Sequence, residues 1–259
     1  MFEQDRFIVR LQQSVMREGD VGICFLGGSY GSRRADEFSD LDAVLVYDGD
    51  AARDAAWTRR REFAHSVLPY VPARSFDAAH ERAYLHSALY SNGAKVDYRY
   101  ETRESLAPEP AHAEIRILKD ADGWAEQYQA ASARVLPAVT RVEAAELERL
   151  DNQFWVMFWD VYRQLLRGDA ERPFITYLNL LDFTLPPLLE ALPPEDASYQ
   201  GLIDVAYSRD AEATLVHLRR LLDAYLAARS AVIRRHNVGY IPDQGFERGI
   251  MQTLNRRGR

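Results

Sequence analysis

The stretch of residues 21–47 constrains the fold most, because two apolar runs flank a glycine-rich turn. The first run, Val21–Leu26, is short, apolar and bounded by glycines, which is the pattern of a buried β-strand. Gly27 and Gly28 then permit a sharp turn where a side chain would collide. The second run, residues 43–47, predicts another strand, so this stretch is expected to fold as strand, turn with a short helix or loop, and strand.

The polar residues of this stretch are those that a nucleotide and a metal require. Ser29 stands where a helix can begin, so its hydroxyl and the free backbone N–H groups can bind an anion. Asp40 and Asp42 open the second strand and share one of its faces, because side chains at i and i+2 project together. Carboxylate oxygens are the ligands that Mg²⁺ prefers. A phosphate-binding turn beside a Mg²⁺ site predicts a nucleoside triphosphate as co-substrate.

Two other phosphate-binding motifs are excluded in this stretch. The P-loop requires a Gly-Lys-Ser/Thr sequence, and the turn contains no lysine. The Gly-x-Gly-x-x-Gly turn of dinucleotide-binding proteins is not matched, because Arg33 and Arg34 occupy the positions of the later glycines.

The spacing of the motif resembles that of a known superfamily. The Gly28-Ser29 pair, the eleven-residue step from Ser29 to Asp40, and the sequence Ser39-Asp40-Leu41-Asp42 resemble the DNA polymerase beta-type nucleotidyltransferases. The small antibiotic-modifying members, such as the kanamycin and lincosamide nucleotidyltransferases, are the most similar. These proteins often carry a basic residue three positions after the serine. Here that position is Ser32, and Arg33 follows one position later.

The resemblance implies roles for the residues of the motif. The triphosphate is expected to contact Gly28, Ser29, Ser32 and Arg33. Asp40 and Asp42 are expected to bind the metal, as two Mg²⁺ ions.

A hairpin further along the chain supplies a third acid. Residues 83–90 and 94–101 form two strand patterns around Asn92-Gly93, a strong turn dipeptide. In the second strand, alternation places Lys95, Asp97 and Arg99 on one face. The resemblance implies that Asp97 lies beside Asp40 and Asp42 as a metal ligand and as the catalytic base. The alternative is an aspartate at the rim that pairs with Lys95 or Arg99.

Beyond this region, the sequence pattern changes near Pro137 from mixed to helical. The expected N-terminal elements are helices at about 3–18, 51–67 and 124–135 and a strand at 115–119. Residues 140–143 fit a capping box that opens a helix ending near 167, followed by helices from 173, at 199–207, 210–236 and 245–256. The predicted class is α+β, with a nucleotidyltransferase catalytic domain at 1–136 containing a small mixed sheet. Residues 137–259 are predicted to form a helical bundle for substrate binding or dimerisation.

Three features of the helical half leave alternatives open. Residues 154–159 are apolar on all sides, which predicts either the centre of a bundle or a homodimer interface. Asp160 could bind an ammonium group of a substrate or pair with Arg163 in a helix salt bridge. Arg229 and His236 resemble the active motif of helical-bundle ribonucleases of toxin–antitoxin pairs, or His236 stabilises a helix C-terminus.

Charge and hydropathy limit the partners. The formal net charge of −7 argues against a nucleic-acid partner, since such proteins usually present a basic surface. The N-terminus lacks the pattern of a signal peptide and no apolar run has membrane-spanning length, so a cytoplasmic protein with no membrane partner is expected.

The predicted function is a Mg²⁺-dependent nucleotidyltransferase. It would move a nucleoside monophosphate, with AMP from ATP favoured, to a hydroxyl of a small molecule and release pyrophosphate. An aminoglycoside or lincosamide antibiotic is the expected acceptor class. The alternative is a non-catalytic or antitoxin-like nucleotide-binding module that acts through a protein partner.

Overall fold

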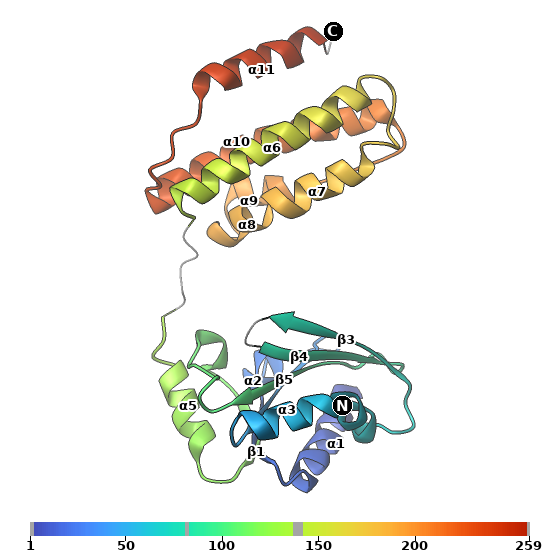
Figure 1. Ribbon diagram of the computed structural model, residues 1–259, viewed down its shortest axis with the longest axis vertical. Coiled ribbons are helices and arrows are strands. Elements are labelled where there is room, and N and C mark those ends of the chain that lie inside the picture. The colour runs from blue at the N-terminus through green and yellow to red at the C-terminus, as the bar shows by residue number, and fades with distance from the viewer. Residues whose placement is uncertain (1–2, 81–82, 137–141, 258–259) are drawn as a thin grey trace. The chain divides into compact units, whose positions relative to one another are not determined.

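The protein consists of a mixed α/β unit followed by a helical unit (Figure 1). The computed structural model describes residues 3–80, 83–136 and 142–257. The chain divides into two compact units, Met1–Pro137 and Ala138–Arg259. The first contains all the described strands and the second only helices, which confirms the predicted α+β class.

One sheet organises the first unit. Among the described residues six strands pair in the order β3-β4-β5-β2-β1-β6. The strands are β1 Val21–Leu26, β2 Leu41–Tyr47, β3 Ala73–His80, β4 Ala83–Tyr90, β5 Lys95–Thr102 and β6 Arg116–Asp120. Every neighbouring pair is antiparallel except β2 and β5, which are parallel. The sheet is therefore mixed, and its two central strands begin at the same edge.

Helices cover both faces of this sheet. α1 Glu3–Arg17, α3 Asp50–Thr58 and α4 Arg60–Val67 pack on one face around a large apolar core. α5 Trp124–Ser132 covers part of the other face through a smaller core. The short helix α2, Gly28–Gly31, links β1 to the loop before β2, and a 3₁₀ turn, η1, spans Pro110–His112. Polar side chains of β2 and β5 project from this second face as well.

Alternation along β2 decides which of its side chains are buried in which core. Leu41, Ala43 and Leu45 belong to the core under α1, α3 and α4. Val44 and Val46 belong to the core under α5, so Asp42 projects from the same face as these two valines. The apolar run that predicted this strand thus also directs its one carboxylate towards the α5 face.

Three sequence-based expectations of secondary structure are wrong. The single helix expected at 51–67 is two helices, because Arg59 leaves the helical conformation with φ −95° and ψ 10°. Strand β3 was not expected at all. Glu143 is the residue before α6, Ala144–Leu165, and makes no side-chain cap bond, so the capping box is not formed at that helix; its other end, Thr140, lies outside the described residues.

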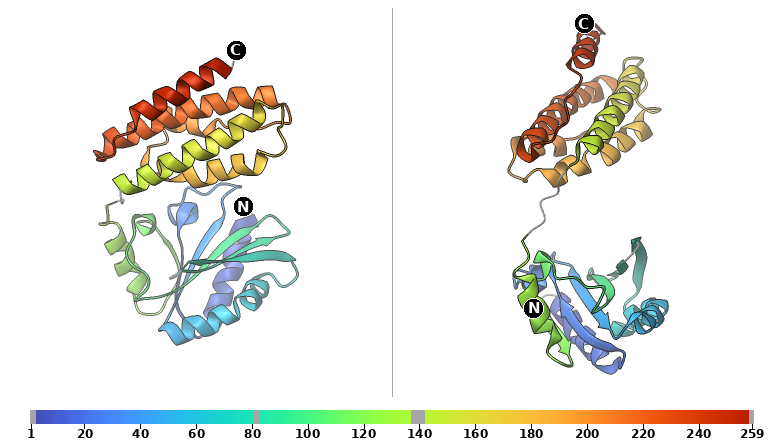
Figure 2. Two further views of the ribbon diagram at one scale, coloured as in Figure 1. Left: turned by 45° about the horizontal axis from the view of Figure 1, so that its top comes forward. Right: turned by 60° about the vertical axis from the view of Figure 1, so that its left-hand side comes forward.

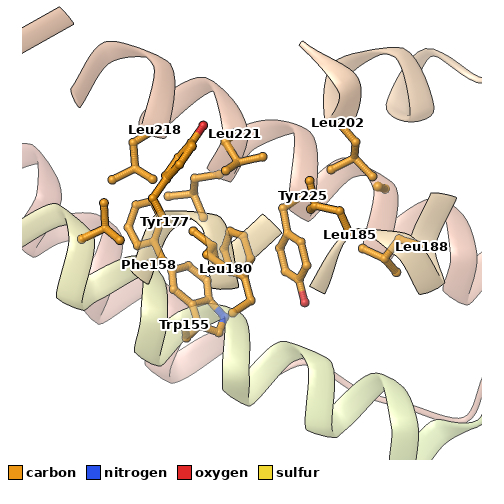
Figure 3. Close-up of a cluster of buried hydrophobic side chains, with 14 of the residues drawn as sticks. Trp155, Phe158, Tyr177, Leu180, Leu185, Leu188, Leu202, Leu218, Leu221 and Tyr225 are labelled. Atoms are coloured by element: carbon orange, nitrogen blue, oxygen red, sulfur yellow. The ribbon is translucent and has the colours of Figure 1, made fainter. Parts of the chain in front are cut away.

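The helical unit packs its helices around aromatic and leucine side chains. It comprises α6, α7 Phe174–Thr184, α8 Pro186–Ala191, α9 Ala197–Ile203, α10 Ala211–His236 and α11 Gln244–Arg257. α6 and α10 lie side by side (Figure 2), and the rings of Phe154 and Tyr225 stack with centroids 3.5 Å apart. Figure 3 shows Trp155 and Phe158 of α6 facing Leu218 and Leu221 of α10 in this core. Phe154, Trp155 and Phe158 of the apolar run therefore lie in the bundle core, as one of the two predicted roles required, whereas Val156 is 67% exposed.

The two polar features predicted in this unit have structural partners. Asp160 accepts a hydrogen bond from Arg163 Nε at 2.9 Å, so the salt-bridge alternative is confirmed. Arg229 is 3% exposed and donates to Asp151 Oδ1 at 2.6 Å. His236 Nε2 lies 2.8 Å from the carbonyl oxygen of Ala191. These contacts favour structural roles for Arg229 and His236 over the ribonuclease-like one.

None of the described helices has both the length and the apolar character needed to cross a membrane.

Candidate active site

Three carboxylates converge at the edge of the sheet where β2 and β5 begin. Asp42 and Asp97 are register partners on these parallel strands, and Asp40 lies in the loop two residues before Asp42. One carboxylate oxygen from each of the three residues lies within 4.8 Å of the other two. Parallel pairing is the reason for this convergence, since side chains at matched positions of neighbouring strands project from the same face. The structure thus brings together the acids of both sequence motifs.

A lysine bridges two of these carboxylates. Lys95 Nζ donates to Asp40 Oδ2 and to Asp97 Oδ2, each at 2.8 Å. The ammonium group therefore lies between oxygens that a metal ion would also contact. Asp97 pairs with Lys95, as one of its two sequence alternatives required, and it also lies beside the other two acids.

The acids differ in their surroundings. Asp42 is partly buried, and its pKa is raised by this burial and by the neighbouring charges of Asp40 and Asp97. Asp97 Oδ1 accepts a hydrogen bond from Ser87 Oγ at 2.6 Å. Ser87 lies on β4 and is 5% exposed, so it fixes the orientation of the Asp97 carboxylate from within the protein. Negative charge held close together in a partly buried site creates a demand for a cation.

The glycine turn approaches this cluster closely. Gly28 has a φ of +56°, in the left-handed region that favours glycine, and a β-carbon at this position would overlap Oδ2 of Asp42. Gly31 is equally constrained, because a β-carbon there would lie 2.5 Å from the carbonyl oxygen of Glu114. The absence of side chains at Gly28 and Gly31 allows α2 to sit directly beside the acids and the strand β6 region.

The predicted phosphate-binding residues fall into two groups. Gly28, Ser29 and Ser32 line one cavity together with Arg34, whose Nε lies 3.2 Å from Ser32 Oγ. Arg33 has a φ of +58° and lines a different cavity, with Tyr30 and Arg116. The left-handed turn at Arg33 places it on the other side of the loop, so Arg34 is the arginine beside Gly28 and Ser29. Sequence reasoning named Arg33 and passed over Arg34.

A cleft of about 400 Å³ extends from Gly28 and the acids along the sheet. Arg99 of β5, Glu109 and His112 also line this cleft. Arg99 donates from Nε to Glu101 Oε1 at 2.6 Å and from Nη1 to Glu109 Oε1 at 2.8 Å. The cleft therefore has an acidic end at Asp42 and Asp97 and a mixed wall that contains a guanidinium and an imidazole. The sequence interpretation gave no role to Glu109 or His112, because they lie in an irregular segment without a motif.

Comparisons with known proteins give two matches. The sequence model of the streptomycin adenylyltransferase family matches residues 4–177, which is more than half of the chain and includes every predicted site residue. No curated protein matches. Among solved structures, an aminoglycoside 6-adenyltransferase from Bacillus subtilis is similar with 13% sequence identity over 96% of this chain and 97% of that chain, and with a TM-score of 0.37.

Proposed function

Because the chain belongs to the streptomycin adenylyltransferase family and is a nucleotidyltransferase, we propose that it transfers AMP from ATP to a hydroxyl of an aminoglycoside. The observation that carries this proposal is the convergence of Asp40, Asp42 and Asp97 beside the Gly28 turn. A triphosphate with its counter-ions needs both features at one place: oxygen ligands for a metal and a close-approach turn for phosphate.

The donor set fits Mg²⁺. All three side chains offer carboxylate oxygens, the ligand type this ion prefers, and the Lys95 ammonium already takes up a cation's position between two of them. Asp40, Asp42 and Asp97 would hold two ions. Bound there, Mg²⁺ would neutralise the triphosphate and stabilise the departing pyrophosphate. Lys95 Nζ contacts Asp40 and Asp97, so it would compete with the ions for these two carboxylates.

The turn residues are proposed to hold the phosphate chain. Ser29 offers its hydroxyl and Gly28 leaves room for the chain to approach the backbone. Ser32 and Arg34 line the same cavity and are placed to contact the outer phosphates. Arg33, at the other side of the loop, is the weaker candidate of the two arginines.

Asp97 is proposed to activate the acceptor as well as to bind metal. Its Oδ1 is held by Ser87, and its Oδ2 is released when Lys95 withdraws. A carboxylate fixed in this way can accept the proton of the acceptor hydroxyl as that oxygen attacks the α-phosphorus. The electrons of the P–O bond to the β-phosphate then leave with pyrophosphate, and the proton stays on Asp97 until solvent removes it.

The acidic balance of the protein suits a cationic acceptor. The formal net charge of −7 and the carboxylates that line the cleft would attract amino or guanidino groups. Lincosamides carry a single amine and remain the second acceptor class.

The non-catalytic alternative is not favoured. The chain belongs to an adenylyltransferase family, and all three acids of the predicted set are present and lie together.

Mass spectrometry of reaction mixtures tests the proposal. The protein is incubated with Mg²⁺, each nucleoside triphosphate in turn, and a panel of streptomycin, other aminoglycosides and lincosamides. The expected product is an aminoglycoside carrying one adenylyl group, formed with ATP and lost with a chelator. Transfer to lincosamides alone would show that the acceptor is a lincosamide and not an aminoglycoside. No transfer to any acceptor of the panel would contradict the proposal.

A further inference from the structure

His112 lies against the phosphate-binding turn in an orientation that its own partners fix. The residue ends η1, is 6% exposed, and lines the cleft with Gly28 and Asp42. A β-carbon at Gly27 would lie 3.3 Å from His112 Cδ2 and 3.5 Å from Nε2. The Nε2 edge of the ring is therefore the edge that faces the turn.

The opposite edge of the ring is held by two oxygens. His112 Nδ1 lies 2.7 Å from the Tyr128 hydroxyl and 3.0 Å from Glu109 Oε1. Tyr128 donates its own hydrogen to the carbonyl oxygen of Ala107 at 3.1 Å, so towards the imidazole it is an acceptor. Glu109 is an acceptor as well. Both contacts require a hydrogen on Nδ1.

The position of that hydrogen determines what Nε2 can do. In the neutral ring with hydrogen on Nδ1, Nε2 carries a lone pair, which would repel a phosphate oxygen. With a second proton, Nε2 becomes a charged donor aimed at the turn. Building on the function proposed above, we propose that His112 binds the outer phosphates of the triphosphate through Nε2, and that it takes up a proton from solvent when the nucleotide binds.

The charged groups around the ring are consistent with this exchange. Burial lowers the pKa of His112, and Arg99 acts in the same direction, whereas Glu109 and Glu101 raise it. The free enzyme therefore favours the neutral ring at neutral pH. Asp42 and Asp97 face the same cleft, but bound metal would neutralise their negative charge. The added negative charge that favours protonation of His112 is therefore that of the phosphate chain.

Glu109 and Tyr128 would then act as positioning residues. Glu109 is shared between Arg99 and His112, which links the guanidinium of the cleft wall to the imidazole. Tyr128 comes from α5 and stacks on Trp124 with centroids 4.9 Å apart, so the helix that covers this face also sets the ring orientation.

Calorimetry of nucleotide binding tests the inference without turnover, since no acceptor is present. Mg·ATP and AMP are titrated in buffers of different ionisation enthalpy at about pH 7.5, one unit above the ordinary pKa of histidine. The wild type should take up close to one proton with ATP. His112→Gln should take up about one proton fewer than the wild type. It should bind ATP about 10- to 100-fold more weakly, the range for a hydrogen bond to a charged group, and its affinity for AMP should be unchanged. The control, His65→Gln, changes an exposed histidine of α4 and should behave as wild type.

Each outcome decides between the two proposals. If the wild type binds no Mg·ATP, the proposed function fails and this inference with it. If the wild type binds Mg·ATP, but His112→Gln takes up the same number of protons or loses ATP and AMP affinity equally, only this inference is overturned. Should His112→Gln fail to fold, Glu109→Gln decides instead, because removing the carboxylate beside Nδ1 should reduce the proton uptake. An uptake equal to that of the wild type would overturn the inference.

Discussion

Gly28 and Asp42 are so close that a β-carbon on the glycine would overlap the Oδ2 atom of the aspartate. Gly28→Ala should therefore displace the Asp42 carboxylate in addition to straining a residue with φ +56°. We expect the variant to fold with a free energy of unfolding lowered by about 1–2 kcal/mol, the cost of the left-handed conformation. Mg²⁺-dependent binding of ATP, measured by calorimetry, should be largely lost.

Gly123→Ala is the matched control for that variant. Gly123 has a φ of +77° and nothing lies within 4 Å of its β-carbon position. This substitution should cost similar stability in urea unfolding and leave ATP binding intact. Equal loss of binding in both variants would mean that backbone strain, and not the Asp42 contact, is responsible.

Lys95→Met should make the stability of the protein depend on Mg²⁺. Without the ammonium, repulsion among the three acids is relieved only by metal, so the melting temperature should fall in chelator and recover on adding Mg²⁺. Mg²⁺ itself should bind more tightly, because it no longer competes with Lys95. Since the Lys95 side chain is 43% exposed, we expect the free energy of unfolding and the free energy of Mg²⁺ binding each to change by only about 1 kcal/mol.

The other lysine of the chain provides the control. Lys119 Nζ donates to the carbonyl oxygens of Val15 and Glu18, far along the chain from the acids. Lys119→Met should lower the melting temperature by the same amount with and without Mg²⁺. A wild-type-like response of Lys95→Met to Mg²⁺ would argue that the lysine and the metal do not share a site.

Ser29→Ala should weaken the binding of ATP and leave the binding of AMP nearly unchanged. The hydroxyl is expected to contact the β- or γ-phosphate, and one hydrogen bond to a charged group contributes about 1.5–3 kcal/mol. Competition binding of the two nucleotides measures the difference. A loss of equal size for AMP would place the hydroxyl at the α-phosphate or the ribose.

Asp97→Asn should retain the fold and lose transfer by at least about 10²-fold, the lower range for a positioned general base. The asparagine oxygen can still accept the hydrogen bond from Ser87 Oγ, but an amide cannot take up the proton of the acceptor hydroxyl. If Mg·ATP binding persists and kcat falls, Asp97 acts as the base. If Mg·ATP binding disappears, it is chiefly a metal ligand, and near-normal kcat would return it to the role of a partner for Lys95.

His86 should make the protein less stable as the pH falls below about 6.5, the ordinary pKa of histidine. Its Nδ1 contacts Asp77 at 2.8 Å, while the buried Nε2 has no hydrogen-bond partner among the described residues. Burial lowers the pKa of His86, so below pH about 6.5 the unfolded chain binds a proton that the folded protein resists, and stability is lost.

His86→Phe isolates this contribution. At pH 7 the free energy of unfolding of the variant should be lower by about 1 kcal/mol, because the hydrogen bond to Asp77 is lost. Towards pH 5 this free energy should fall less steeply than that of the wild type. Urea unfolding across this range measures both. His65→Gln, which changes an exposed histidine, should retain the wild-type slope.

The predictable parts of this fold are those whose residues carry the signal locally. The turn at Gly28 and the alternation around Asp97 follow from glycine chemistry and from the two-residue period of a strand. Strand β3 could not be predicted in this way, because Arg74, Ser75 and Phe76 are all exposed and the strand has a single neighbour, β4. Its pairing with β4, and not its own pattern, makes it a strand.

The misplaced helix boundary and the missed site residues have a tertiary cause. Arg60, the first residue of α4, donates to Asp77 on β3 at 2.6 Å, a contact between residues 17 positions apart. His112 reaches the Gly27–Gly28 turn only because the chain folds back over the sheet before β6. Neither contact has a signature in neighbouring residues, so only the folded chain reveals them.

The parallel pairing of β2 with β5 also governs when the acids meet during folding. The chain between these strands carries α3, α4 and two further strands, so the pairing of Asp42 with Asp97 joins residues that are distant in sequence. Such non-local pairing forms late, after the entropy of closing a long loop has been overcome. A ligand that needs both carboxylates can then bind only to the completed sheet. Metal and nucleotide should accordingly lower the rate of unfolding and leave the rate of folding unchanged.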